Sequence, residues 1–152
     1  MKRLVLIGVA IVILLSACIS CALNAEKEIA AITIAEKWLA LIDTGKYSNS
    51  WQEADENFRS KVPQDKWIQI LQIVRTPMGK VISRKLETKV YKTSLPGAPD
   101  GHYVIIQYIT SFQDKRNFTE TVVSAFDKDG RWRVLGYNIQ FCSYCYMKMV
   151  ID

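Results

Sequence analysis

Two charged residues in apolar surroundings, Arg84 and Glu120, are the strongest candidates for chemistry in this sequence. Arg84 and Glu120 each fall in a segment where apolar and polar residues alternate, the pattern of a half-buried strand. The residues expected to share their strand faces are apolar: Ile82, Leu86 and Val90 around Arg84, and Phe118 and Val122 around Glu120. Because an unpaired buried charge is strongly destabilising, both side chains must meet a partner. We expect them to face one cavity, either as a buried ion pair or as a pocket for an anionic ligand.

Aromatic residues could complete such a pocket. Trp38, Trp51 and Tyr108 are the candidates, since an aromatic ring can stack on a ligand and a tyrosine can also donate a hydrogen bond. Tryptophans on an apolar helix face more often pack in the core, so these residues also fit a purely structural role. Further charged residues that the helices could bring to the cavity are Asp43, Asp55 and Arg75.

The side chains that usually act as nucleophile and base do not form a catalytic set in this sequence. The only histidine, His102, lies beside a predicted turn, and we find no convincing Ser/His/Asp or Cys/His/Asn arrangement. One histidine is also too few for a typical metal site built on imidazole, so we expect neither a metal nor a cofactor. A mechanism that relies on the Glu120 carboxylate is the enzymatic alternative.

Two of the cysteines form a motif near the C-terminus, Cys142-Ser143-Tyr144-Cys145. A redox site would need its first cysteine at a helix N-terminus, where the thiol pKa falls, and a zinc site would need a second such pair. The motif instead follows the last predicted strand, so we expect a local disulfide between Cys142 and Cys145 in an oxidising compartment. Cys21 would then be left over and could link two copies of the chain.

The first residues predict export and lipid anchoring. Lys2 and Arg3 precede an apolar run, residues 4–15, and Leu15-Ser16-Ala17-Cys18 resembles a bacterial lipobox. The resemblance implies that Cys18 is acylated and becomes the new N-terminus. Two or three acyl chains hold a protein at a bilayer far more firmly than one.

Lipoprotein processing would divide the chain into four parts. We expect a signal peptide at 1–17, a lipidated tether at 18–24, a folded domain at 25–141 and a Cys-containing tail at 142–152. Because no aspartate follows the acylated cysteine, the expected location is the outer membrane, facing the periplasm, in a cell that has two membranes.

Two other outcomes of export are open. Residues 4–23 carry no charge and are long enough to span a bilayer as an uncleaved anchor. Ordinary signal cleavage after Ala22 or Ala25 would instead release a soluble protein. All three outcomes place the domain outside the cytoplasm.

The elements that must position these residues begin with helices. Apolar residues recur at helical spacing over residues 32–42, and Gly45 can adopt the left-handed conformation that ends a helix. Ser50 and Glu53 match a Ser-x-x-Glu capping box, which predicts that a second helix begins at Trp51.

The second half of the chain has the pattern of a sheet. A third helix is predicted after Pro63 and must end before Pro77, and from Lys80 onward the apolar period changes from helical to alternating. The predicted strands are 81–92, 102–112, 118–126 and 131–141. Three helices followed by four antiparallel strands predict an α+β domain, with the N-terminal helices packed on a curved sheet.

The chain resembles an exported bacterial family catalogued as domain of unknown function 4019. The resemblance covers residues 30–140 and rests on several short motifs taken together. The residues that carry it are Trp38-Leu39, Ile42-Asp43, Gly45, Tyr47, Ser50-Trp51, Phe58, Trp67, Arg75, Pro77, Gly79, Ser83-Arg84, Leu95 to Gly101, Tyr103 to Tyr108, Glu120, Asp129-Gly130 and Trp132 to Val134. It implies the cone-shaped fold of nuclear transport factor 2-like (cystatin-like) proteins and an exported location, and it supplies no activity.

Composition narrows the possible partners. The formal charge of +5 falls to +3 without Lys2 and Arg3, and no basic run interleaved with aromatic residues is present, so we expect no nucleic acid. The sequence therefore predicts a lipid-anchored cell-envelope protein that binds a small ligand or a protein partner without catalysis. A small hydrolase or isomerase that uses the cone cavity is one alternative. A structural dimer that pairs through the sheet face is the other.

Overall fold

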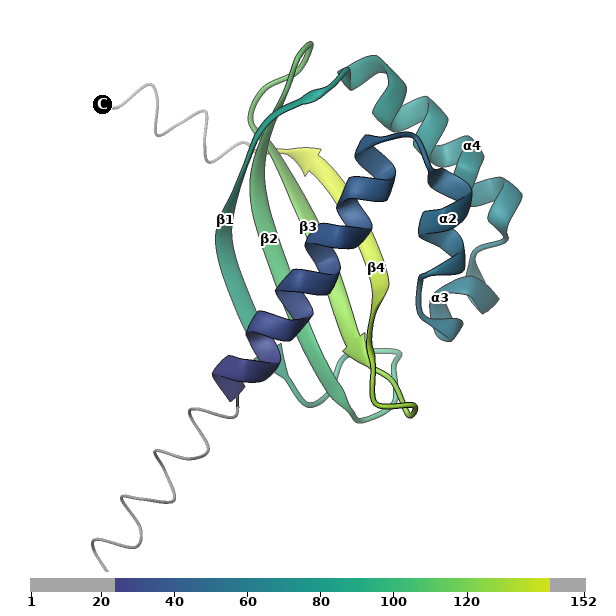
Figure 1. Cartoon of the computed structure of the whole chain (residues 1–152), viewed down its shortest axis with the longest axis vertical. Helices are drawn as coiled ribbons and strands as arrows, with labels where there is room; N and C mark the ends of the chain where they lie inside the picture. Colours follow the sequence, from purple (N-terminus) through teal and green to yellow (C-terminus); the bar gives the residue numbers. More distant parts are fainter. Residues whose placement is uncertain (1–23, 143–152) are drawn as a thin grey trace, which may run out of the picture.

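An open antiparallel sheet forms one layer of the computed structural model, which describes residues 24–142. Its strands are β1 (Val81–Lys92), β2 (His102–Phe112), β3 (Phe118–Phe126) and β4 (Trp132–Phe141), arranged in the order β1-β2-β3-β4. Each strand pairs with the one that follows it in the chain, so the sheet is a simple meander (Figure 1). The predicted α+β class is confirmed, and three of the four strands have the predicted bounds.

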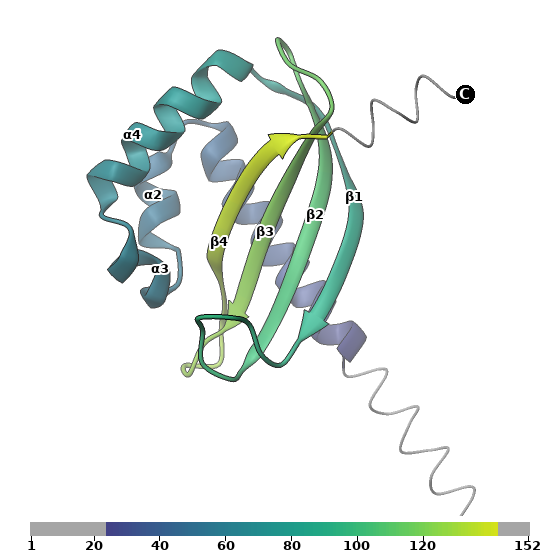
Figure 2. The same ribbon diagram turned by 180° about the vertical axis from the view of Figure 1, so that it is seen from behind.

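Helices form the second layer. A long N-terminal helix, residues 24–43, lies across one face of the sheet, and α2 (Tyr47–Gln52), α3 (Glu56–Lys61) and α4 (Gln64–Arg75) lie beside β4 (Figure 1). A short 3₁₀ helix, η1 (Thr76–Met78), leads from α4 towards β1. Seen from behind, the opposite face of the sheet carries no helix (Figure 2).

The turn after the N-terminal helix follows the sequence prediction. Gly45 has a φ of 72°, and its N–H donates to Ile42 O at 3.0 Å. The next N–H, from Lys46, donates to Leu41 O at 2.8 Å. A left-handed glycine with these two bonds satisfies the last carbonyls of the helix.

The capping-box prediction at Ser50 is wrong. Ser50 lies inside α2 and is buried, and its hydroxyl donates to Tyr47 O at 2.8 Å. The predicted second helix is instead two short helices, and α3 is capped by Asp55, whose Oδ1 accepts from the N–H of Asn57 at 2.7 Å. The break has a tertiary cause, because the N–H of Asp55 bonds to Val134 O on β4 at 2.8 Å.

The core lies between the helices and the covered face of the sheet. At its centre the ring of Trp38 lies 5.8 Å from that of Trp67 and 5.6 Å from that of Tyr137. Phe58 of α3 meets Trp67 edge to face at 5.0 Å. These rings join the N-terminal helix, α3, α4 and β4 into one apolar cluster.

Pairing between β1 and β2 slips at two places, near Ile82 and near Glu87. Such bulges shift the alternation of side chains between the two faces. Arg84 pairs with buried Thr110 on the covered face, whereas Val90 lies on the opposite face, and Ile82 at the first bulge is 68% exposed. The prediction that Arg84 shares its face with Ile82 and Val90 is therefore wrong, and bulges cannot be read from the alternation alone.

Within residues 24–142, no helix is both long enough and apolar enough to cross a membrane. The predicted signal peptide, the acylation site at Cys18 and the residues that follow Cys142 lie outside the described part of the chain.

Candidate functional site

Arg84 lies between two carboxylates. Its Nε donates to Glu120 Oε2 at 2.7 Å, and its Nη1 and Nη2 donate to the two carboxylate oxygens of Asp43 at 2.6 and 3.0 Å. Asp43, at the end of the N-terminal helix, also accepts from Nη2 of Arg75 on α4 at 2.8 Å. The structure thus joins Asp43, Arg75, Arg84 and Glu120 into one cluster, which we call the buried ion network; Glu120 and Arg75 are buried, Arg84 is half-buried, and Asp43 lies at its exposed rim.

Glu120 is the most enclosed member of the network. Its side chain is 0% exposed, and besides Arg84 it accepts from the hydroxyl groups of Thr110 and Tyr137, each at 2.6 Å. Burial raises the pKa of Tyr137 above its ordinary value, and the Glu120 charge raises it further. The phenol therefore stays protonated and donates to the carboxylate.

The two cations of the network, Arg75 and Arg84, have different surroundings. The guanidinium of Arg75 lies 4.2 Å from the ring centroid of Phe112, a cation–π distance, and its side chain is only 4% exposed. Burial alone would lower the pKa of the Arg84 guanidinium, but hydrogen bonds to Asp43 and Glu120 outweigh that effect and raise it. Arg84 therefore carries full charge at any ordinary pH.

The network is balanced, with two cations and two anions. Its sequence candidates, Arg84 and Glu120, are brought together, and of the further helix residues considered, Asp43 and Arg75 join them. Asp55 does not, because it caps α3. Since each charge faces an opposite charge, the arrangement ties elements together and leaves no unmatched cation for an anionic ligand.

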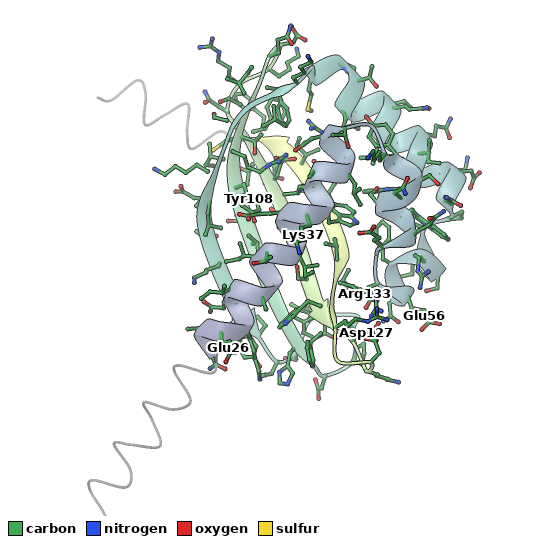
Figure 3. All side chains as sticks on the ribbon, in the orientation of Figure 1. Glu26, Lys37, Glu56, Tyr108, Asp127 and Arg133 are labelled. Atoms are coloured by element: carbon green, nitrogen blue, oxygen red, sulfur yellow. The ribbon has the colours of Figure 1, made fainter. Side chains whose placement is uncertain are left out.

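Tyr108 lies on the face of β2 towards the N-terminal helix (Figure 3). It is buried, and within residues 24–142 its hydroxyl has no hydrogen-bond partner. Burial and the charge of Glu36 raise its pKa to about 12, against an opposing effect of Arg84. Tyr108 therefore differs from Tyr137 in that, among the described residues, no hydrogen bond compensates for the burial of its hydroxyl.

The two candidate tryptophans have structural hydrogen bonds. Trp38 is buried, and its indole N–H donates to Ser50 O at 2.7 Å. Trp51 is half-buried and donates to Val62 O at 2.7 Å, with the Arg59 guanidinium 5.9 Å from its ring. Neither tryptophan lines either of the two pockets described below.

A pocket of about 270 Å³ lies away from the buried ion network. We call it the loop pocket, because one wall is the β1–β2 segment, residues 95–99, which crosses the helix-free face of the sheet (Figure 2). The opposite wall is α3, and the floor is formed by β3 and β4. Its lining residues are Asn57, Phe58, Lys61, Val62, Leu95, Pro96, Gly97, Ala98, Pro99, Val123, Leu135 and Gly136.

Sequence reasoning missed the loop pocket. The segment Leu95 to Gly101 joins two of the predicted strands, and its prolines and glycines favour a stiff connection. Nothing in the local pattern says that the segment reaches α3, where Lys61 Nζ lies 3.5 Å from Gly97 O. The signal that could have found it is the loop's length combined with its apolar residues.

A smaller pocket of about 130 Å³ adjoins the loop pocket and shares Asn57, Ala98, Pro99 and Leu135 with it. Its charged lining residues are three acids, Asp55, Asp100 and Asp127, and one base, Lys128. Asp127 pairs with Arg133 at 2.8 Å across the β3–β4 turn (Figure 3). In residues 24–142, no group of three or more metal-binding side chains comes together here or elsewhere.

His102 and Cys142 have more contacts than the sequence indicated. His102 was expected beside an exposed turn, but it is half-buried, and its Nδ1 shares a short hydrogen bond with the hydroxyl of Tyr91. Cys142 is buried and disulfide-bonded, and its N–H donates to Asn117 O at 2.6 Å. Cys145 lies outside the described residues, so its pairing with Cys142 stays a prediction.

Comparison with protein families gives one match, over residues 34–137. The family is described as Protein of unknown function (DUF4019), and its model covers more than half of the chain. The chain belongs to this family. The DUF4019 region contains the whole buried ion network and every residue that lines the loop pocket.

No curated protein and no solved structure is significantly similar to the chain. The family match confirms the resemblance to DUF4019, while the nuclear transport factor 2-like arrangement stays a prediction.

Proposed function

We propose that this DUF4019 protein is a lipid-anchored protein of the cell envelope whose domain binds a small ligand in the loop pocket without catalysing a reaction. The observation that carries the proposal is the contrast between the loop pocket and the buried ion network. The loop pocket is open to a ligand, whereas the charges of the buried ion network are matched by one another.

The lining of the loop pocket supports binding. Most of its residues are apolar, and the polar groups are few: the amide of Asn57, the ammonium of Lys61 and main-chain atoms. A concave apolar surface with a small number of placed polar groups is the usual composition of a small-molecule site.

The burial and the hydrogen bonds of Glu120 argue against catalysis as the main role of the domain. A general base must reach the proton that it removes, but Glu120 is fully buried and its oxygens already accept three hydrogen bonds. A hydrolase or isomerase would therefore need a different carboxylate.

The anchor rests on the sequence pattern around Cys18 and on the place where the domain begins. The N-terminal helix is already formed at residue 24, so the tether from Cys18 is short. Six residues of extended chain reach roughly 20 Å, less than the length of a helix of about 20 residues, which is about 30 Å. The end of the domain that carries the helix start would then stay close to the bilayer. The segment between β1 and β2 lies at that same end (Figures 1 and 2).

Mass spectrometry of the protein purified from its own membranes tests both parts of the proposal. We expect a mature chain that starts at an acylated Cys18, with a small molecule released on denaturation. Cys18→Ser should abolish the acyl mass and leave the precursor uncut, because the thiol is the acylated group. An unmodified chain starting at Glu26 would refute the anchor, and a chain free of any co-purified molecule would weaken the binding proposal.

A dimer through the sheet is the second candidate. The face shown in Figure 2 carries no helix, and a partner could cover it. Analytical ultracentrifugation of the purified protein separates the two roles, since a dimer that forms without a ligand would favour the structural one.

A further inference from the structure

We infer that the loop pocket takes an amphiphile with a short apolar chain and a carboxylate at one end, with Lys61 neutralising the carboxylate. This inference rests on the proposed binding function and names the ligand class for the same site. It is carried by the position and charge of one lysine against an otherwise uncharged lining.

Lys61 is the only charged residue among those that line the loop pocket. It ends α3 and is exposed, and over residues 24–142 it has no ion-pair partner. Its ammonium has one acceptor, Gly97 O, at the long distance of 3.5 Å. A carboxylate at the rim would therefore give this lysine a charge-assisted hydrogen bond without displacing an existing ion pair.

The neighbouring charges set the direction in which the ligand lies. The smaller pocket that adjoins the loop pocket at Pro99 has three acids in its lining, Asp55, Asp100 and Asp127, against one base, Lys128. Like charges repel, so an anionic group is disfavoured at that side and favoured at the Lys61 rim. The apolar chain is left with the space between Phe58, Leu95 and Leu135.

The size of the pocket limits the chain. Its volume of about 270 Å³ is just below the roughly 300–1,000 Å³ of pockets that hold drug-sized ligands. The floor is widened by Gly136, where a Cβ atom would lie 3.9 Å from the Cβ of Val123, in ordinary contact. A larger side chain at Gly136 would therefore occupy the pocket without a backbone clash, which makes this position suitable for a blocking substitution.

Photo-crosslinking in the membrane tests the inference on the full-length protein. The probes are octanoic acid and octan-1-ol, each with a diazirine in the chain, and labelled peptides are mapped by mass spectrometry. We expect the acid to label residues 57–62, 95–99 and 135–136, and to reach half-saturation at about tenfold lower concentration than the alcohol. Unlabelled octanoate should compete.

Two pairs of variants make the result specific. Lys61→Met should remove the preference for the acid and leave labelling by the alcohol, whereas Lys66→Met, on exposed α4 surface, should change neither. Gly136→Leu should abolish labelling by both probes. Asn138→Leu, two residues along β4 and outside the lining, is its matched control. Circular dichroism confirms that each variant is folded.

Each outcome decides a different claim. Equal labelling by acid and alcohol that Gly136→Leu abolishes would overturn the anionic ligand class and keep the proposed binding function. Labelling that Gly136→Leu leaves unchanged would overturn the loop pocket as the site, and with it both proposals.

Discussion

Tyr108 is buried and Tyr137 is partly buried beneath the helices, and they differ in the partners of their hydroxyl groups. The hydroxyl of Tyr137 donates to Glu120 Oε1 at 2.6 Å, whereas that of Tyr108 has no partner in residues 24–142. A hydrogen bond to a charged group contributes about 1.5–3 kcal/mol, but an unpartnered buried hydroxyl costs about 1–3 kcal/mol.

The two tyrosines should therefore respond in opposite directions to the same substitution. Tyr137→Phe should lower the free energy of unfolding by about 1.5–3 kcal/mol, and Tyr108→Phe should leave it unchanged or raise it by up to about 1 kcal/mol. Urea denaturation of both variants measures this, with equal m-values as the control. A large loss in Tyr108→Phe would mean that its hydroxyl is bonded after all.

The buried ion network makes a second prediction at the level of single residues. Arg84→Met should destabilise the protein by about 3–5 kcal/mol, because Glu120 loses its ion pair while it stays buried. Adding Glu120→Gln should recover much of the loss, since the remaining pair, Arg75 and Asp43, is neutral by itself. Chemical denaturation of the single and double variants gives the coupling energy. Additive effects would contradict the ion pair.

Among the elements, α3 begins at the N-cap Asp55 and not at the capping box predicted for Ser50. Asp55 caps α3 through the N–H of Asn57, whereas Glu53 is exposed and follows the last residue of α2. Asp55→Ala should therefore cost about 0.5–2 kcal/mol of stability, the usual loss for an N-cap. Glu53→Ala should be nearly neutral. Thermal unfolding of the two variants separates them, and a large effect of Glu53→Ala would restore the capping box at Ser50.

How far each element could be predicted depends on how local its determinants are. Three strand ranges follow from alternation between turn residues, because both signals lie within a few residues of each strand. The division between α2 and α3 could not be predicted, since it depends on a hydrogen bond from Asp55 to Val134 on a distant strand.

The candidate site, like the helices and strands, could be predicted only in part from the sequence. Arg84 and Glu120 stand out because charges interrupt apolar patterns, and the structure places them 2.7 Å apart. Asp43 and Arg75 could be named only as possible partners, because the packing of the N-terminal helix and α4 on the sheet decides whether their side chains reach Arg84 and Glu120. The length and apolar residues of the loop hint that it packs against something, but its partner could not be predicted, because the two walls of the loop pocket are about 35 residues apart in the chain.

For the whole molecule, the sequence separations within the buried ion network have a kinetic consequence. The bonds from Arg84 to Glu120 and to Asp43 span 36 and 41 residues, whereas each strand of the meander pairs with the next one along the chain. Short-range hairpins cost less entropy to close, so we expect the meander to form in the folding transition state and the network to form after it.

Arg84→Met should then leave the folding rate nearly unchanged and accelerate unfolding about a hundredfold for a loss of about 3 kcal/mol. Stopped-flow folding and unfolding in urea measure both rates, and a slowed folding arm would place the network in the nucleus. If the network forms last, it acts as a latch that determines how long the folded state survives once it has formed.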